Sequence, residues 1–375
     1  MLEKMLKYRR DLHEIPEIGF DLPKTHNYVK TVLESLGYKI NFYAKTGIVV
    51  IKEGKTNDTY AFRADMDALL ISEKTNVSFK SKHEGFMHAC GHDGHTAMLL
   101  GFAEYLANIK DNHYTIMLIF QPAEEGPGGA KVMIEEGIFN NYNIKGIFGL
   151  HLAPFIDENI YGLKNGLMLA ANAEFDIEIE GVSAHGATPN EGIDTIIASS
   201  NLVVQLNNIV SRFISPVNPA VLSVGIIKGG TAKNIISDHT YIAGSVRAFD
   251  KKTYDLINSK ISDICKGIEK SFNVKINYKF KDLYPPVNND EELFNLVDRT
   301  LNKDEKIYLE PLTFSEDFAF YQQVVPGMFI FIGSKNDENY YPLHSPYFNF
   351  DEKILLNGYN LYVKIYEQLN DNRSK

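Results

Sequence analysis

The chain has little cysteine and little positive charge. It contains 2 cysteines, Cys90 and Cys265, among 375 residues. Two thiols are too few for a disulfide framework, so we expect an intracellular protein with reduced thiols. Its 38 lysines and arginines face 48 aspartates and glutamates, which gives a formal net charge of -10. This excess of negative charge argues against nucleic acid or an anionic membrane as a partner, because both attract basic surfaces.

Long apolar runs are also missing. No segment approaches the roughly 20 consecutive apolar residues that a membrane span needs. The first residues, MLEKMLKYRRDLHEIPEIGF, carry charges throughout and do not resemble a signal peptide. Internal repeats and low-complexity tracts are absent as well. The sequence therefore predicts a cytoplasmic globular protein. Its length exceeds what one hydrophobic core usually organises, so two domains are expected.

Strands and helices alternate along both ends of the chain. Residues 25–36 have apolar side chains at helical spacing, and Gly37 follows as a C-terminal stop. The apolar runs that predict strands are GIVVIKEG, YAFRADMD, YTIMLIF, KGIFGLHL and GMFIFIGS. Their continuous apolar character is typical of a sheet that is covered on both faces. With the intervening apolar helix HTAMLLGFAEYLANIK, they predict an α/β domain with a mixed, largely parallel sheet flanked by helices.

The middle of the chain has a different pattern. EFDIEIEG alternates strictly between apolar and acidic residues, as a half-exposed strand does. It is followed by a helix over 192–213, the strands AVLSVGIIKGG and TYIAGSVRAFD, a helix over 251–272 and the strand VKINYKFKDL. This order, β-α-β-β-α-β, is that of a ferredoxin-like α+β unit. We therefore expect an inserted domain at 173–284 that interrupts a first domain made of 1–172 and 285–375.

Histidine and cysteine are concentrated in one short segment. MHACGHDGH, residues 87–95, holds three of the chain's 11 histidines and one of its 2 cysteines. Glu124 and Glu125 follow directly after an apolar strand, and His151 and His344 lie at strand ends or in loops. Functional groups collect where the strands of a parallel sheet end, so these side chains can converge on one crevice.

These residue types are the usual ligands of zinc and its first-row neighbours. The candidate ligands are Cys90, His92, Glu125, His151 and His344. Five donors are more than one four-coordinate ion uses while it keeps an open catalytic position. The set therefore favours two metal ions that share bridging groups.

Each of these residues also has a simpler interpretation. A single histidine such as His151 or His344 is more often a hydrogen-bonded structural residue. Cys90 can be a small buried apolar residue, and paired glutamates usually lie on a solvated face. The glycine-rich stretches GPGG and KGGTAKN lack the Lys-Ser/Thr ending of a phosphate-binding loop. The histidines that we expect to be structural, or to support the ligands, are His13, His83, His88 and His95.

Several segments resemble the M20 peptidase-type amidohydrolases. They are RRDLHEIPEIGF, RADMDAL, HACGHDGHTAMLLG, FQPAEEGPGGAKVMIEEG, SAHGATPNEGID, NIISD, FSEDFAF and LHSPYFNFDE. The resemblance runs in order over essentially the full length. It is to the subgroup of hippurate hydrolases, indole-acetyl-amino-acid hydrolases and N-acetyldiaminopimelate deacetylases. It implies a di-metal catalytic domain formed by both ends of the chain. It also implies an inserted lid domain that often makes a homodimer or higher homo-oligomer.

Carried over by position, the resemblance makes the five candidate donors the ligands of two divalent ions per subunit, which are Zn, Mn, Co or Ni. It makes Glu124 the general base and Asp65 the second catalytic acidic residue. Many relatives have a ligating histidine two positions before that aspartate, where this chain has Arg63. In the set that the resemblance implies, Cys90 supplies the missing donor. Asp65 matches the family's acidic residue by position, but the histidine that usually accompanies it is absent here.

Three residues of the inserted domain match the family's substrate contacts. His185 corresponds to the lid histidine that stabilises the oxyanion, in its own site or in a partner subunit's site. Its simpler interpretation is a turn residue that caps a loop. Asn234 and Arg247 correspond to positions that hold the substrate carboxylate, a task that suits the two-pronged arginine. The alternative for Arg247 is a surface salt bridge on an exposed strand.

The resemblance also implies a reaction. We expect hydrolysis of a linear amide that removes an acyl group, most simply acetyl, from an N-acyl amino acid. N-acetyl-diaminopimelate, which belongs to lysine biosynthesis, is one named candidate. An aminoacylase, a hippurate-type carboxypeptidase or a dipeptidase uses the same chemistry on another substrate. A metal-binding homologue without catalysis is a further interpretation. Glu124 and Asp65 argue against it, because neither is needed merely to hold ions.

Overall fold

The computed structural model describes residues 1–371 and divides into two compact units. Unit 1 comprises Met1–Met168, Val287–Glu310 and the residues from Glu316 onward. Unit 2 comprises Leu169–Pro286 and Pro311–Ser315. The sequence predicts an insert at 173–284, and it leaves 311–315 in the first domain. The structure assigns that segment to unit 2, because Leu312 pairs with Leu169 and its carbonyl accepts the backbone N–H of Ala170.

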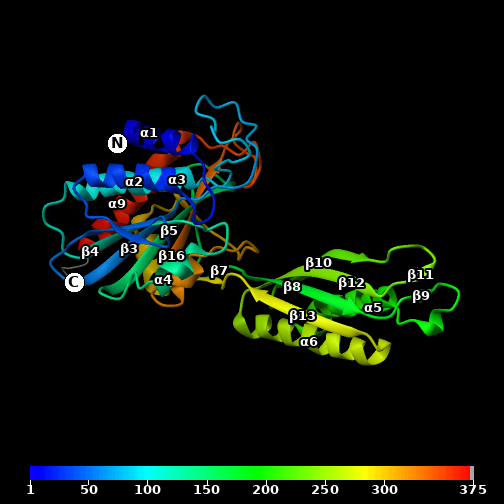
Figure 1. Ribbon diagram of the computed structural model, residues 1–375. Helices are drawn as coiled ribbons and strands as arrows, with labels where there is room; N and C mark the ends of the chain where they lie inside the picture. Colours follow the sequence, from blue (N-terminus) through cyan, green and yellow to red (C-terminus); the bar gives the residue numbers. More distant parts are fainter. Residues whose placement is uncertain (372–375) are drawn as a thin grey trace. The chain divides into compact units, whose positions relative to one another are not determined.

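An eight-stranded sheet forms the centre of unit 1 (Figure 1). Its order is β1-β2-β4-β3-β5-β16-β6-β15. The strands are β1 Asn41–Tyr43, β2 Gly47–Lys52, β3 Asp58–Asp65, β4 Thr115–Gln121, β5 Asn143–Asp157, β6 Tyr161–Leu163, β15 Lys306–Tyr308 and β16 Gly327–Lys335. The neighbours β4, β3, β5 and β16 run parallel, whereas β2 and β6 run antiparallel to β4 and β16. The predicted mixed, largely parallel sheet is confirmed.

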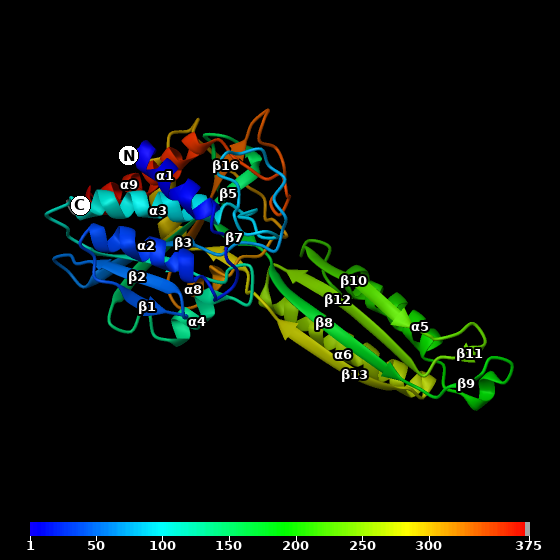
Figure 2. The same cartoon turned by 45° about the horizontal axis from the view of Figure 1, so that its top comes forward.

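Helices flank this sheet. They are α1 Leu2–His13, α2 Pro23–Ser35, α3 His92–Ala107, α4 Gly129–Glu135, α7 Glu291–Thr300, α8 Ala319–Gln322 and α9 Leu355–Asp371. α1, α2, α3 and α9 gather on one side of the sheet (Figures 1 and 2). α3 contacts the other three, which explains its continuous apolar sequence. The predicted start of this helix at His95 is wrong: it begins at His92, because Gly91 adopts a left-handed conformation with φ of 86° and ends the preceding turn.

Unit 2 contains an antiparallel sheet of order β10-β12-β8-β13 with two helices. In chain order its elements are β8 Ala171–Glu180, α5 Thr195–Asn208, β10 Ala220–Gly229, β12 His239–Ala248, α6 Lys251–Phe272 and β13 Lys275–Asp282. Apolar residues of both helices join one face of the sheet in a single core, so both helices cover the same face. The order β-α-β-β-α-β is the predicted one. The helix expected over 192–213 is α5 followed by a π-helical turn, Ile209–Phe213.

Short elements complete the described chain. β9 Ala184–His185 pairs with β11 Ile235–Ile236, and β7 Gly166–Leu169 pairs with β14 Val287–Asn289. Two 3-10 turns lie at Pro189–Glu191 and Glu352–Ile354. The sequence predicts neither small sheet, because strands of two to four residues carry too little periodicity. Within residues 1–371, no helix is both long enough and apolar enough to cross a membrane.

Candidate metal centre

The carboxyl ends of three parallel strands bring the first site residues together. β3 ends at Asp65, which pairs with Gln121 at the end of β4. On its other side, Arg63 of β3 pairs with Gly149 of β5. His151 lies two residues beyond that pair on β5, so it is level with Asp65 at the same edge of the sheet.

The loop after β4 carries Glu124 and Glu125. Ala123 begins it with a positive φ of 57°, and its carbonyl accepts the backbone N–H of Gly129. A Cβ at Gly129 would lie 1.8 Å from the carbonyl oxygen of Pro122, so only glycine fits this close approach. The GPGG stretch is therefore a tight turn that keeps the two glutamates at the sheet edge.

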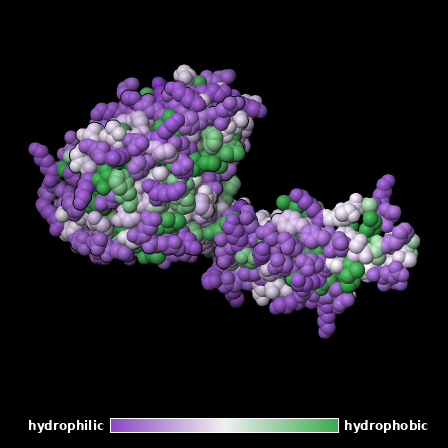
Figure 3. Space-filling view, viewed as in Figure 1, coloured by the Kyte–Doolittle hydropathy of each residue, from purple (hydrophilic) through white to green (hydrophobic). Residues whose placement is uncertain are grey.

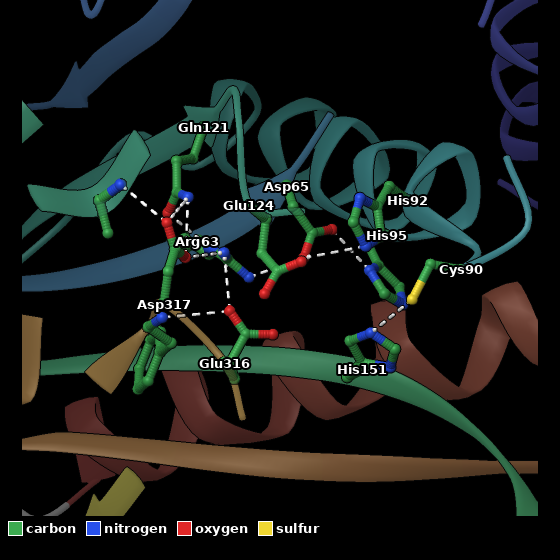
Figure 4. Close-up of polar contacts among 12 residues, drawn as sticks. Arg63, Asp65, Cys90, His92, His95, Gln121, Glu124, His151, Glu316 and Asp317 are labelled. Carbon is green, nitrogen blue, oxygen red and sulfur yellow. Dashed lines mark hydrogen bonds and ion pairs between the residues drawn. The ribbon is translucent and has the colours of Figure 1, made fainter. Parts of the chain in front are cut away.

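Cys90 and His92 flank Gly91 at the start of α3. The left-handed backbone at Gly91 favours glycine, and an added Cβ would lie 2.7 Å from Cδ1 of Leu152. This turn brings Sγ of Cys90 to 3.4 Å from Nε2 of His151 (Figure 4). The histidine-rich turn and β5 thus meet at one point.

The five predicted ligands form two overlapping groups. The ligand atoms of Cys90, His92 and His151 lie within 4.8 Å of one another, as do those of Cys90, Glu125 and His344. Nε2 of His344 lies 3.1 Å from Oε1 of Glu125, and the His344 side chain is 52% exposed. Cys90 is common to both groups, which suits two ions that share a bridging donor. The open side at His344 suits the entry of a substrate.

The protonation state of His151 also suits a metal ion. Nδ1–H of His151 donates to the carbonyl of Leu152 at 2.7 Å, so Nε2 is left to face Cys90. Burial and the neighbouring His95 lower the pKa of His151 well below its ordinary value, so the ring is neutral, the form that binds a metal. Neither ring nitrogen of buried His92 has a hydrogen bond of ordinary geometry to a described residue. Buried polar atoms normally have partners, and a bound cation would supply one.

Negative charge accumulates beside these donors. Burial raises the pKa of the Cys90 thiol well above its usual value, and the charges of Glu125 and Glu124 add to this. Burial likewise raises the pKa of Glu124, and the charges of Glu316 and Glu125 raise it further. The carboxylate oxygens of Glu124, Glu316 and Asp317 lie within 4.8 Å of one another. Divalent cations would offset this charge and permit a Cys90 thiolate.

Asp65 uses both carboxylate oxygens in contacts with the protein. Oδ1 accepts Nδ1–H of His95 at 2.6 Å, and Oδ2 accepts a guanidinium N–H of Arg63 at 2.7 Å. The backbone N–H of Leu152 donates to Nε2 of His95 at 3.0 Å. Both ring nitrogens of His95 are thus engaged, so it supports Asp65 and has no lone pair left for a metal ion.

Sequence reasoning missed the other partners of Arg63. The guanidinium is fully buried and donates to Gln121 at 2.9 Å, Glu316 at 3.0 Å and Asp317 at 2.8 Å (Figure 4). Asp317 also accepts the backbone N–H of Ala130 at 3.0 Å. One cation therefore ties together the ends of β3 and β4 and the segment before α8. The only signal was that both acids lie within FSEDFAF, a segment that carries part of the resemblance.

A second buried polar cluster surrounds Asp93, the residue after His92. Oδ2 of Asp93 accepts Nδ1–H of His13 at 2.8 Å and lies 3.4 Å from Nε of Arg9. Nε2 of His13 lies 3.3 Å from Glu73. These contacts tie α1 to the start of α3.

His88 is also buried, and Nδ1–H of His83 donates to the carbonyl of Pro16 at 2.7 Å.

The three predicted substrate contacts lie in unit 2. His185, in β9, pairs with Ile235 and is exposed, and its Nδ1 accepts the backbone N–H of Ala187 at 3.0 Å. The carbonyl of Asn234 accepts the backbone N–H of Gly186, so Asn234 lies beside His185. Arg247, on β12, is partly buried and donates to Oγ of Ser315 at 2.8 Å. It is not in a surface salt bridge among the residues that the structure describes.

Comparisons with known proteins agree on one family. The model of peptidase family M20/M25/M40 matches residues 61–368. A hippurate hydrolase of Campylobacter jejuni is 41% identical over 367 residues, which cover 96% of this chain and 94% of the relative. An N-acetyl-L-cysteine deacetylase of Bacillus subtilis is 40% identical over 378 residues, which cover 99% of this chain and 90% of the relative.

Solved structures give the same result. A putative aminohydrolase from methicillin-resistant Staphylococcus aureus has a TM-score of 0.92 and 35% identity, covering 98% of this chain and 96% of its own. A Bacillus subtilis protein described as a dinuclear metal-binding peptidase of the M20 family has a TM-score of 0.84 and 31% identity, covering 97% of both chains. The predicted family resemblance and fold class are confirmed.

Proposed function

The chain belongs to peptidase family M20/M25/M40, whose members hydrolyse amides with the help of metal ions, and we propose that it removes the acyl group from N-acyl amino acids. The observation that carries this proposal is the pair of overlapping donor groups around Cys90, with Glu124 buried beside them. The names of the two curated relatives agree in chemistry: hippurate and N-acetylcysteine are both amino acids with an acylated amine.

Cys90, His92, Glu125, His151 and His344 are the ligands in this proposal. Their mixture of thiolate, imidazole and carboxylate suits zinc and the neighbouring ions manganese, cobalt and nickel. Two such ions, when bound, polarise the substrate carbonyl and lower the pKa of a water molecule from about 15.7 towards 7.

Glu124 is the proton carrier in this proposal. It accepts a proton from the attacking water as the water oxygen bonds to the acyl carbon. It then returns the proton to the amine nitrogen as the C–N bond of the amide breaks. Burial and the charge of nearby Glu316 raise the pKa of Glu124, and the positive charge of bound cations would lower it again, so that the group can start the reaction as a carboxylate. Asp65, held between Arg63 and His95, stays in place beside the donors.

Unit 2 supplies the remaining contacts in this proposal. His185 stabilises the tetrahedral oxyanion, in its own or a partner subunit's site. Asn234 and Arg247 bind the α-carboxylate of the amino acid, which a guanidinium can grip with two parallel N–H groups. Acetyl is our first choice of acyl group, with N-acetyl-diaminopimelate as one candidate substrate. Benzoyl is the second, because a hippurate hydrolase is so similar over its full length.

We also propose a cytoplasmic homodimer that pairs through unit 2. β10 is an edge strand of its sheet, and large apolar side chains are exposed on it and on α5. Examples are Val221, Ile227, Ile197 and Val204. Figure 3 shows apolar residues on the surface of this unit near its β9–β11 end. A second copy of the chain would cover these exposed apolar side chains. Light scattering on the full chain would measure the mass of the particle and so test whether it is a dimer. The cytoplasm suits the two free cysteines.

The decisive experiment changes Glu124 to Gln. The variant should keep its metal ions, measured by elemental analysis, and lose at least about 100-fold in kcat on N-acetyl and N-benzoyl amino acids. Glu135→Gln, at an exposed glutamate of α4, is the matched control. Normal turnover by the Glu124 variant would reject this mechanism. The same substrates, N-acetyl-diaminopimelate and a set of dipeptides, assayed after stripping and reloading each metal separately, identify the substrate class and the metal.

A further inference from the structure

We propose that Asp67 is a positioning residue that holds His92 and the Glu124–Glu125 loop in the arrangement the metal ions need. The proposal rests on the proposed ligand set. Sequence reasoning gave Asp67 no role. It lies two residues beyond the end of β3, and it is buried, with 1% of its surface exposed.

One carboxylate makes all of the contacts. Oδ1 of Asp67 accepts the backbone N–H of Glu124 at 3.0 Å, and Oδ2 accepts the backbone N–H of Glu125 at 3.1 Å. Oδ1 also lies 3.5 Å from Nδ1 of His92. Two consecutive N–H groups that point at one carboxylate fix both Cα atoms, and therefore the directions in which the two glutamate side chains leave the loop.

The contact with His92 determines which ring nitrogen can bind a metal ion. Nε2 of His92 faces the other donors, 3.7 Å from Oδ2 of Asp65 and 4.0 Å from Oε1 of Glu125. Nδ1 faces Asp67 on the opposite side of the ring. At 3.5 Å this contact is longer than an ordinary hydrogen bond, but the negative charge of the carboxylate favours the proton on Nδ1 and so leaves the lone pair on Nε2. The carbonyl of Leu152 does the same for His151.

Asp67 is not itself a ligand in this arrangement. It belongs to none of the groups of three donors that the described residues form within 4.8 Å. Both of its oxygens accept backbone N–H groups. Its position therefore couples the start of α3, where one ligand lies, to the loop after β4, where Glu125 and the proposed base lie. A substitution at Asp67 should therefore displace both the start of α3 and the loop after β4.

The test is Asp67→Asn in the full-length protein. Asparagine has the same shape, but in either orientation its NH2 group faces a backbone N–H, that of Glu124 or that of Glu125, so one hydrogen bond becomes a repulsion. We expect zinc affinity, measured by competition with a chelator, to fall by about 10–100-fold. We also expect kcat on an N-acetyl amino acid to fall while KM changes little. Asp58→Asn is the matched control, because Asp58 lies at the other end of β3 in an exposed pair with Lys145.

A second measurement does not depend on how the variant folds. Nitrogen-15 spectra of the zinc-loaded wild-type protein, labelled at histidine, report which ring nitrogen of His92 carries the proton. We expect the proton on Nδ1 and the metal on Nε2. Ligation through Nδ1, or a folded Asp67→Asn variant with unchanged zinc affinity, would overturn the proposal. Both readouts are independent of substrate, so they stand even if Glu124 proves not to be the base.

Discussion

Replacing Arg63 with methionine removes a buried cation that contacts three buried acids. Its guanidinium bonds to Asp65, Glu316 and Asp317 at 2.7, 3.0 and 2.8 Å, and all four side chains are almost completely buried. Methionine has similar bulk and no charge. The variant therefore leaves the carboxylates in place without their partner, a change that costs far more than replacing all the charged groups together.

The magnitude follows from these contacts. Breaking a buried ion pair by removing one partner costs about 3–5 kcal/mol. Proteins of ordinary stability unfold with about 5–15 kcal/mol, so Arg63→Met should remove a large part of the stability of unit 1. Protonation of the acids limits the loss. Burial already raises the pKa of Glu316 and of Asp317, and Arg63 opposes that rise in both.

Because protonation of the acids limits the loss of stability, the pH dependence of unfolding is a second measurement of the effect. Without Arg63, Glu316 and Asp317 should bind more protons in the folded protein than in the unfolded chain, because burial raises the pKa of both. Stability of the variant should then rise as pH falls, and the gap to wild type should narrow from pH 8 to pH 5. Urea unfolding of the chelator-treated protein, followed by circular dichroism at several pH values, measures both quantities.

Arg10→Met is the control for this experiment. Arg10 is 47% exposed at its side chain and pairs with Glu352 at 2.6 Å, so its loss should cost at most about 1 kcal/mol. Arg63→Lys keeps the charge, but its amine cannot reach all the partners of the guanidinium. Its loss in free energy of unfolding should lie between those of Arg10→Met and Arg63→Met. A loss for Arg63→Met no greater than that for Arg10→Met, at every pH, would refute the reasoning.

Two further predictions concern other parts of the chain. Burial lowers the pKa of His13, but the charge of Asp93 and the hydrogen bonds to Asp93 and Glu73 outweigh this and raise it to about 9. The stabilisation by charged His13 should therefore be complete below pH 6.5 and be lost as pH rises through about 9. The variant His13→Gln should lack this pH dependence of the free energy of unfolding, measured with urea between pH 6 and 9.5. Identical pH dependence in both proteins would contradict the assignment. Arg247→Ala should lower kcat/KM at least about 10-fold on N-acetyl amino acids and little on their α-amides, and an equal loss on both would exclude Arg247 from carboxylate binding.

The sequence predicts most of what depends on local pattern. Continuous apolar runs predict the buried strands, and strict alternation in EFDIEIEG predicts the half-exposed β8. Cysteine and histidine are rare in this chain, and Glu125 closely follows an apolar strand, so the amino-acid sequence is enough to name Cys90, Glu125 and His344 as candidates. Their meeting point follows from a general property of parallel sheets, namely that strand ends share an edge.

The sequence pattern does not predict contacts between segments that lie far apart in the chain. Glu316 is 253 residues from Arg63, and no local pattern relates them. Asp67 lies in RADMDAL, where its role depends on which backbone N–H groups the loop after β4 turns towards it. The same holds for 311–315, which join unit 2 through the bridge between Leu312 and Leu169 and through hydrogen bonds with Ala170 and Arg247. These contacts depend on how distant segments pack in the folded chain, so the local sequence pattern does not predict them.

Arg63 and Cys90 contribute to the charge balance at the centre in different ways. An arginine has no lone pair for a metal ion, so position 63 can contribute only positive charge. A Cys90 thiolate adds both a donor and a negative charge, next to Glu125 and His344. Arg63 places a permanent cation beside the acids Glu316 and Asp317. That cation does not depend on pH or on metal, so it can hold the acid-rich segment in place while the metal ions come and go. Arg63 is therefore a structural charge beside the centre, whereas Cys90 is a candidate metal donor.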